Sequence, residues 1–241
     1  MRILSIGNSF SVNAQKYLHT VANLSGSNID CANLVIGGCP LVRHYQNMLS
    51  EEPAYGVNFN GIYTGFRMSL QQALLAQWDV VTLQQASIDS PNPDSYFPYV
   101  TELADLIRRY SPKAKIYIHE TWAYSQEFTR FESMGCTDQR DMYEKLHAAY
   151  AHAAEAINAN GILPCGSAFQ RLLAKGATKL HSDTAHADPN LGCLTLSATW
   201  ITALTGKDLR GMDWSALNAD VTADEIRMAQ EAAYEACQGL N

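Results

Sequence analysis

The stretch RILSIGNSFS, residues 2–11, decides how this chain folds. Its first five residues are mostly apolar, which is typical of a strand buried on both faces of a parallel sheet. Gly7 and Asn8 follow as a turn, and residues 12–24 have the apolar period of a helix. A strand that runs at once into a helix is the repeating unit of an α/β fold.

The same alternation continues along the chain and predicts a parallel sheet covered by helices on both faces. The predicted strands are residues 2–6, 29–36, 79–84, 115–120 and 161–165. One intervening helix ends at Arg109, before Pro112. The last helix begins at the capping box of Thr222 and Glu225 and ends at Gly239.

Two long connections interrupt the alternation. Residues 52–66 carry Asn-Gly and Thr-Gly turn signals and predict a small hairpin, whereas residues 121–135 are aromatic and polar. Long structured loops of this kind are usually functional, and both leave the sheet edge where α/β folds form a crevice. No repeat or linker divides the chain, so we interpret residues 1–241 as one domain.

Composition excludes several functions. The 241 residues are 47% hydrophobic and 17% charged, against a usual charged share of about 25%, so the chain can fill a core and is not disordered. The formal net charge is −7 and the Lys and Arg residues are scattered, which predicts no nucleic-acid partner. The most apolar run, residues 191–206, is broken by Thr and Ser and is shorter than the ~20 residues that span a bilayer, so no membrane span is expected.

The N-terminus and the cysteines indicate a reducing compartment. The apolar run of residues 2–6 is too short for a secretory leader, so a cytoplasmic location is expected, although removal of a leader would leave the same sequence. The six cysteines form no C-x-x-C pair, and a chain of this size does not need disulfides. We therefore expect reduced, mostly buried cysteines.

Ser9 lies on the turn from the first predicted strand to the helix, at the mouth of the predicted crevice. Backbone N–H groups of the turn lie close to such a serine, which suits a nucleophile. The alternative is that Ser9 or Ser11 is only the N-cap of the helix, because serine is a preferred cap.

A serine nucleophile needs a base that an acid holds in one tautomer. Asp183 and His186 follow the last predicted strand and are three residues apart, so the carboxylate can accept from Nδ1–H and leave Nε2 facing a serine. Two alternatives remain open. The segment is a helix-capping turn built on Asp183 or Asp188, or His181, Asp183, His186 and Asp188 bind a metal ion, although no familiar ligand spacing is complete.

Four segments, in this order, resemble the four sequence blocks of the SGNH, or GDSL-type, esterase and lipase superfamily. They are GNSFS at residues 7–11, IGGCPL at 36–41, LQQAS at 83–87 and the Asp-x-x-His of Asp183 and His186. The resemblance implies a three-layer α/β/α sandwich with a flavodoxin-like parallel sheet of about five strands in the order 2-1-3-4-5. It also implies ester hydrolysis with no metal and no other cofactor.

The resemblance assigns roles by position. Ser9 is the nucleophile and its N–H is one donor to the oxyanion, while the Gly38 N–H is a second donor. His186 is the base, and Asp183 orients it.

The chain departs from the family pattern in two places. Asn8 stands where the first block usually has Asp, and Gln84 and Gln85 stand where the third block usually places an oxyanion-binding Asn. We prefer Gln84 as the third donor because it resembles the Gln-Gly-Glu block of the superfamily's carbohydrate acetylesterases. Gln85 is the alternative, since successive strand residues point to opposite faces and only one reaches the site.

Aromatic residues on or beside the loops predict where the substrate binds, because aromatic platforms suit sugar rings. Those expected to line the crevice are Phe10, Tyr63, Phe66, Trp122 and Tyr124. No long apolar lid is present in the sequence, so the expected substrate is a small-molecule or carbohydrate ester with a short acyl group, best an acetyl group. The alternative functions are a metal-dependent hydrolase and a flavodoxin-like domain that binds a ligand without turnover.

Overall fold

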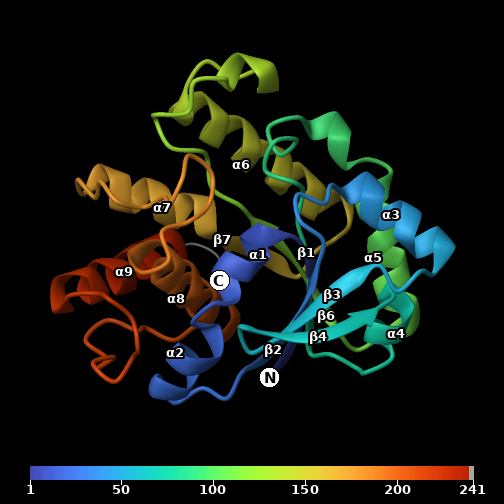
Figure 1. The fold of residues 1–241 in the computed structure, drawn as a ribbon, viewed down its shortest axis with the longest axis horizontal. Coiled ribbons are helices and arrows are strands. Elements are labelled where there is room, and N and C mark those ends of the chain that lie inside the picture. Colours follow the sequence, from blue (N-terminus) through green and yellow to red (C-terminus); the bar gives the residue numbers. More distant parts are fainter. Residues whose placement is uncertain (239–241) are drawn as a thin grey trace.

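A mixed sheet with a parallel centre organises the molecule (Figure 1), which is described here by a computed structural model for residues 1–238. The seven strands follow the spatial order β4-β3-β2-β1-β5-β6-β7. Their bounds are β1 (Arg2–Gly7), β2 (Asp30–Val35), β3 (Tyr55–Phe59), β4 (Ile62–Met68), β5 (Val80–Leu83), β6 (Lys115–Glu120) and β7 (Gly161–Pro164).

The predicted parallel core is confirmed, but the sheet has seven strands rather than about five. The strands β2, β1, β5, β6 and β7 are the five predicted ones, in the expected order 2-1-3-4-5, and Ile3 pairs with Cys31 on one side and with Val80 on the other. The two additional strands form the predicted hairpin, which extends the sheet antiparallel to β2 through pairs such as Val35 with Gly56. The carboxyl ends of the parallel strands meet at one edge, and this edge carries the site.

Helices cover both faces of the sheet, as the alternation predicts. The layer formed by α1, α2, α7, α8 and α9 packs on one face, and the layer formed by α3 to α6 packs on the other (Figure 1). The bounds are α1 (Ser9–Gln15), α2 (Leu18–Leu24), α3 (Leu41–Ser50), α4 (Leu70–Leu74), α5 (Tyr99–Tyr110), α6 (Gln139–Ala156), α7 (Cys165–Ala174), α8 (Leu191–Thr205) and α9 (Ala223–Ala236), with 3₁₀ turns η1 (Pro93–Tyr96) and η2 (Phe131–Met134).

The helix predicted over residues 12–24 is in fact two helices, α1 and α2. The break lies at Tyr17, whose N–H donates to the Ser197 hydroxyl of α8 and whose own hydroxyl donates to the Pro189 carbonyl. These contacts to a distant helix outweigh the local helical period. The last helix has the predicted capping box at Thr222, and its predicted end at Gly239 lies outside the described residues.

The six cysteines are all free and buried, as expected. Among the described helices, none has both the length and the apolar character that crossing a membrane requires.

Candidate active site

Ser9 is the first residue of α1 and follows β1 after a single turn residue. That turn residue, Asn8, is the N-cap, and its Oδ1 accepts from the Phe10 N–H at 3.0 Å. The alternative that Ser9 or Ser11 caps the helix is therefore wrong, and the Ser9 hydroxyl is available to another partner. The turn is tight at Gly7, where an added Cβ would lie 2.2 Å from the Ser11 Oγ.

A histidine approaches Ser9 from a turn near the other end of the chain. His186 Nε2 lies 2.8 Å from Ser9 Oγ, although the two residues are 177 positions apart. Nδ1 of the same ring lies 2.9 Å from Oδ2 of Asp183. The other carboxylate oxygen accepts from the backbone N–H groups of Ala185 and His186, each at 2.7 Å. We refer to Ser9, His186 and Asp183 below as the triad.

Asp183 is held as a carboxylate. Partial burial alone raises its pKa, but the hydrogen bonds from the His186 ring and from the N–H groups of Ala185 and His186 outweigh burial and lower the pKa to about 2. An ionised carboxylate only accepts hydrogen bonds, so a neutral His186 ring carries its proton on Nδ1 and turns the lone pair of Nε2 toward Ser9. A general base requires this tautomer.

The turn of residues 181–187, which carries Asp183 and His186, is attached to the segment that follows β6. A β-bridge between its two ends closes the turn. Three hydrogen bonds then join it to that segment: the Trp122 indole N–H to the Ala185 carbonyl at 2.9 Å, His181 Nε2 to the Ala123 carbonyl at 3.0 Å, and the Ser125 N–H to the Thr184 carbonyl at 2.9 Å. The triad turn and the loop after β6 thus form one connected unit.

Two of the predicted substrate-lining aromatic residues support the triad instead. Phe10 and Trp122 are buried and stack with their ring centroids 4.3 Å apart. Tyr124 is also buried, with its hydroxyl bonded within the protein. Tyr63 and Phe66 are exposed on β4, which β3 and β2 separate from β1. The structure therefore does not gather the five aromatic residues around Ser9, because large rings are buried in the core where the fold permits.

Two backbone N–H groups at this sheet edge are available to a ligand. Among residues 1–238, neither the Ser9 N–H nor the Gly38 N–H donates to another protein group. Gly38 lies in the exposed turn after β2 with φ of +61°, which glycine adopts without strain. The Asn8 side chain donates to the Cys39 carbonyl at 3.2 Å and so ties the Ser9 turn to the Gly38 turn.

Gln84 and Gln85 are both buried, and both amides are bonded within the protein. The Gln84 amide donates to Asn8 Oδ1 at 2.8 Å and accepts from His119 Nδ1 at 2.8 Å. Oε1 of Gln85 accepts from the Leu41 N–H at 2.9 Å, at the start of α3. Gln84 therefore holds the Ser9 turn, and Gln85 holds α3.

His119 is a polar residue of the site whose importance the sequence pattern does not reveal. It is fully buried in β6, and burial lowers its pKa to about 3, so the ring is neutral and donates to Gln84 through Nδ1. The only signal is a histidine that follows the apolar run of residues 116–118 in the predicted strand. Hydrogen bonds run from His119 through Gln84 and Asn8 to the Cys39 carbonyl, and we call this series the relay.

The residues considered as metal ligands do not converge. In the part of the chain that the structure describes, no three His, Cys, Asp or Glu side chains are grouped so that they could hold a metal ion. His181 bonds the Ala123 carbonyl, and the buried Asp188 accepts from the Asn190 N–H at 3.0 Å. The metal alternative thus finds no ligand set here.

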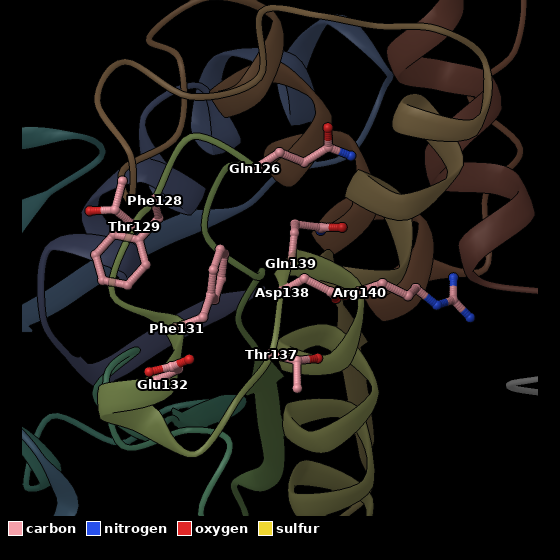
Figure 2. A pocket seen from close by; sticks show the side chains of 9 residues that line it. All are labelled: Gln126, Phe128, Thr129, Phe131, Glu132, Thr137, Asp138, Gln139 and Arg140. Atoms are coloured by element: carbon pink, nitrogen blue, oxygen red, sulfur yellow. The ribbon is translucent and has the colours of Figure 1, made fainter.

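Two hollows share part of their lining, and one of them includes the triad residue Asp183. The larger has a volume of about 540 Å³ and lies between the loop after β6 and the start of α6 (Figure 2). The second has a volume of about 370 Å³ and is lined in part by Asp183. Gln126 and Gln139 line both hollows, whereas Ser9 lines neither.

A model of the domain of unknown function DUF4886 matches residues 2–236. This chain belongs to the DUF4886 family. A crystal structure of a DUF4886 family protein from Bacteroides uniformis is 30% identical to it, covers 98% of this chain and 94% of that one, and superposes with a TM-score of 0.90. No curated protein matches the chain in sequence.

Other solved structures place this DUF4886 chain among the SGNH hydrolases by fold. A candidate SGNH hydrolase from Slackia heliotrinireducens is 26% identical, with a TM-score of 0.58 over 82% of this chain and 94% of that one. A candidate GDSL-like lipase from Parabacteroides merdae covers 100% of this chain and 96% of that one with a TM-score of 0.53, but at 12% identity it shows likeness of fold alone. The resemblance to this superfamily is confirmed, and the fold is a hydrolase fold.

Proposed function

We propose that the chain hydrolyses carboxylic esters through an acyl-enzyme formed on Ser9. The observation that carries this proposal is the 2.8 Å contact between Ser9 Oγ and His186 Nε2, with Asp183 at the other ring nitrogen. A hydroxyl on a neutral imidazole that a carboxylate orients is the arrangement that activates serine for attack. The SGNH-like fold supports the same reaction class by analogy.

In the first step, Ser9 Oγ attacks the ester carbonyl carbon while its proton passes to His186 Nε2. The carbonyl oxygen becomes an oxyanion, which the N–H groups of Ser9 and Gly38 stabilise. Asp183 stabilises the imidazolium by accepting from Nδ1. His186 then gives the proton to the leaving alcohol, and the acyl group remains on Ser9.

In the second step, a water molecule attacks the acyl group on Ser9. His186 takes a proton from that water and the same oxyanion donors act again. The tetrahedral intermediate collapses, the acid leaves, and the proton returns to Ser9 Oγ. Neither step requires a metal ion or a cofactor.

Gln84 has a positioning role in this proposal rather than the role of a third oxyanion donor. Its amide is bonded to Asn8 and His119, and Asn8 in turn bonds the Cys39 carbonyl next to Gly38. The relay therefore sets the spacing between the Ser9 and Gly38 N–H groups. Such preorganisation matters because an oxyanion hole stabilises charge only when its donors are already in place.

The substrate class that we propose is a short-acyl ester, best an acetyl ester, of a carbohydrate. Support comes from the polar and aromatic lining of the two hollows, where Gln126 and Gln139 lie with Phe128 and Phe131. Aromatic faces with nearby amides suit sugar rings.

Labelling with a fluorophosphonate, followed by peptide mapping, tests the nucleophile directly. We expect modification at Ser9, loss of labelling in Ser9→Ala, and hydrolysis of 4-nitrophenyl acetate that survives excess EDTA. Labelling at another serine would overturn the assignment. Loss of turnover in EDTA with recovery on added zinc would instead favour a metal-dependent hydrolase.

A further inference from the structure

We propose that these two hollows, one of which is lined in part by Asp183, form one subsite for the alcohol part of the ester, and that this subsite selects an uncharged or cationic glycan. The inference rests on the proposed ester hydrolysis at Ser9 and adds to it the side on which the alcohol binds and the charge that it carries.

The chemistry places the alcohol on the His186 side of the scissile bond. His186 must protonate the leaving oxygen, so that oxygen lies within hydrogen-bond reach of Nε2. Only the imidazole ring separates Nε2 from the Asp183 carboxylate, which lines the second hollow. In this proposal, a group attached to the leaving oxygen extends past the ring toward the Asp183 side, where the second hollow lies, whereas the acyl group remains on the side of the Ser9 and Gly38 N–H groups.

The two hollows are neighbours that share two glutamines in their walls. Gln126 and Gln139 line both, and the combined space is large enough for more than one sugar ring, because the volumes are about 540 and 370 Å³. Figure 2 shows the two glutamine side chains one above the other, with the Phe128 and Phe131 rings to their left. These rings pack edge to face at 5.2 Å and give the hollow an apolar wall.

Gln139 is the residue that points most clearly to a ligand. The residue is only 6% exposed, its side chain makes no hydrogen bond within residues 1–238, and its amide is not among the atoms that are sealed from solvent. An amide that lines a hollow and has no partner within the protein can bond a polar molecule there. Hydroxyl groups of a sugar both donate and accept, as this amide does.

Charge decides which glycans fit. Among the lining residues, the carboxylates are Glu127, Glu132, Asp138 and Asp183, and the single cation is Arg140. Arg140 pairs with Glu144 at 2.7 Å, which offsets part of its charge. The lining repels uronates, sialates and phosphorylated sugars, and accepts neutral or amino sugars.

The wall of the subsite is also attached to the triad. The three hydrogen bonds between the segment after β6 and the turn of residues 181–187 keep the hollows and His186 in a constant relation. A ring bound in the hollow can therefore orient the ester at Ser9, and this orientation contributes to the rate through preorganised binding.

The test compares substrates that differ only in their alcohol. We would measure kcat/KM for 4-nitrophenyl acetate, mono-acetylated cellobiose and mono-acetylated digalacturonate in the wild type and in Gln139→Ala. We expect kcat/KM for the cellobiose ester, relative to kcat/KM for 4-nitrophenyl acetate, to fall about tenfold in Gln139→Ala. The change should be mainly in KM, because a hydrogen bond between the Gln139 amide and the sugar is lost. The matched control is Gln46→Ala, at an exposed glutamine of α3 outside both hollows, and the ratio should stay as in the wild type.

A second experiment measures the binding of a sugar in the absence of turnover. Free cellobiose should bind to Ser9→Ala and should lose affinity about tenfold when Gln139→Ala is added. The double variant Glu127→Gln, Glu132→Gln removes two negative charges from the lining. It should therefore lower the ratio of kcat/KM for the cellobiose ester to kcat/KM for the digalacturonate ester. An unchanged ratio in Gln139→Ala, or an equal preference of the wild type for both esters, would overturn the subsite. If Ser9→Ala still hydrolyses 4-nitrophenyl acetate, the proposed function itself fails, and this outcome is separate from the other two.

Discussion

Within the described part of the chain, two histidine–carboxylate pairs lie near the carboxyl ends of the parallel strands, and they differ in ways that matter for chemistry. His186 lies 2.9 Å from Asp183, and His147 lies 2.6 Å from Glu120. The Asp183 side chain is 57% exposed, whereas that of Glu120, at the end of β6, is 1% exposed. Distance alone would make the His147 pair the stronger of the two.

The two histidines differ in what their second ring nitrogen, Nε2, contacts. Nε2 of His186 faces the Ser9 hydroxyl, whereas no hydroxyl or thiol in the described chain bonds Nε2 of His147. The second oxygen of Glu120 accepts from the N–H and the hydroxyl of Ser167, so this carboxylate joins β6 and α6 to the start of α7. A histidine–carboxylate pair is thus a common structural link, and it becomes a candidate for catalysis only beside a hydroxyl and free N–H donors.

Removing the hydroxyl should have the largest effect. Ser9→Ala should lower kcat for 4-nitrophenyl acetate by about 10⁶-fold, since the loss of the nucleophile removes the covalent route. The matched control at the other pair, His147→Ala, should keep kcat within about threefold once the folded fraction is accounted for. Similar losses in both variants would show that the two pairs are not functionally different.

Changing the carboxylate of Asp183 should cause the second largest loss in kcat. Asp183→Asn should lower kcat by about 10⁴-fold, because an amide no longer enforces the Nδ1–H tautomer of His186. The low pKa of Asp183, about 2, keeps the wild-type carboxylate ionised from pH 5 to 9, so its titration should not shape the activity profile in that range. Glu120→Gln is the counterpart, and it should change melting temperature more than kcat. Full activity in Asp183→Asn would reduce the Asp-x-x-His segment to a structural turn.

The relay provides a smaller and more specific test. Asn8→Asp restores the residue usual in the superfamily, but an aspartate cannot donate to the Cys39 carbonyl 3.2 Å away. We expect kcat to fall about tenfold with little change in KM, because a buried acceptor left without a donor costs about 1–3 kcal/mol and displaces the Gly38 turn. Gln85→Ala, which removes a contact to α3 and leaves the relay intact, is the comparison. A larger kcat loss in Gln85→Ala would show that the relay does not position the oxyanion donors.

The smallest expected effect is the pH dependence of the free energy of unfolding that the His147–Glu120 pair contributes. The hydrogen bond to Glu120 raises the His147 pKa above 6.5, although burial opposes part of the shift. The stabilisation is therefore complete below pH 6.5 and is lost as pH rises through the raised pKa. Because the ring is half exposed, we expect only a few tenths of a kcal/mol between wild type and His147→Gln at pH 5.5, vanishing by pH 9. Urea unfolding at both pH values measures this difference in the free energy of unfolding. A difference that grows as pH rises would contradict the raised pKa of His147.

Local features of the fold and site follow from the sequence. The predicted strand over residues 115–120 coincides with β6, and the capping box at Thr222 has both of its hydrogen bonds. The bond between Asp183 and His186 is also local, because three intervening positions suffice to form the turn. The order of the five parallel strands followed from the family resemblance rather than from any residue pattern.

The partners of buried polar groups could not be predicted in the same way. Gln84 had the residue type of an oxyanion donor, but the sequence did not show that its amide also donates to Asn8 and accepts from His119 of the neighbouring strand. Phe10 and Trp122 had the composition of a sugar platform, but they stack on each other in the core. Composition does not distinguish a ring that packs inside from one that lines a site, because both uses favour large aromatic surfaces.

By itself, the sequence determined the parallel strands, the capped helices and the Asp183–His186 pair, since apolar period, cap chemistry and short turns depend on residues that are neighbours in the chain. Only the tertiary structure decided that Tyr17 divides the first helix, that the hairpin of β3 and β4 joins the sheet, and that His119 reaches Gln84. These outcomes depend on contacts between segments far apart in the chain, and such contacts exist only after the strands have taken their order and the helices have packed on the two faces.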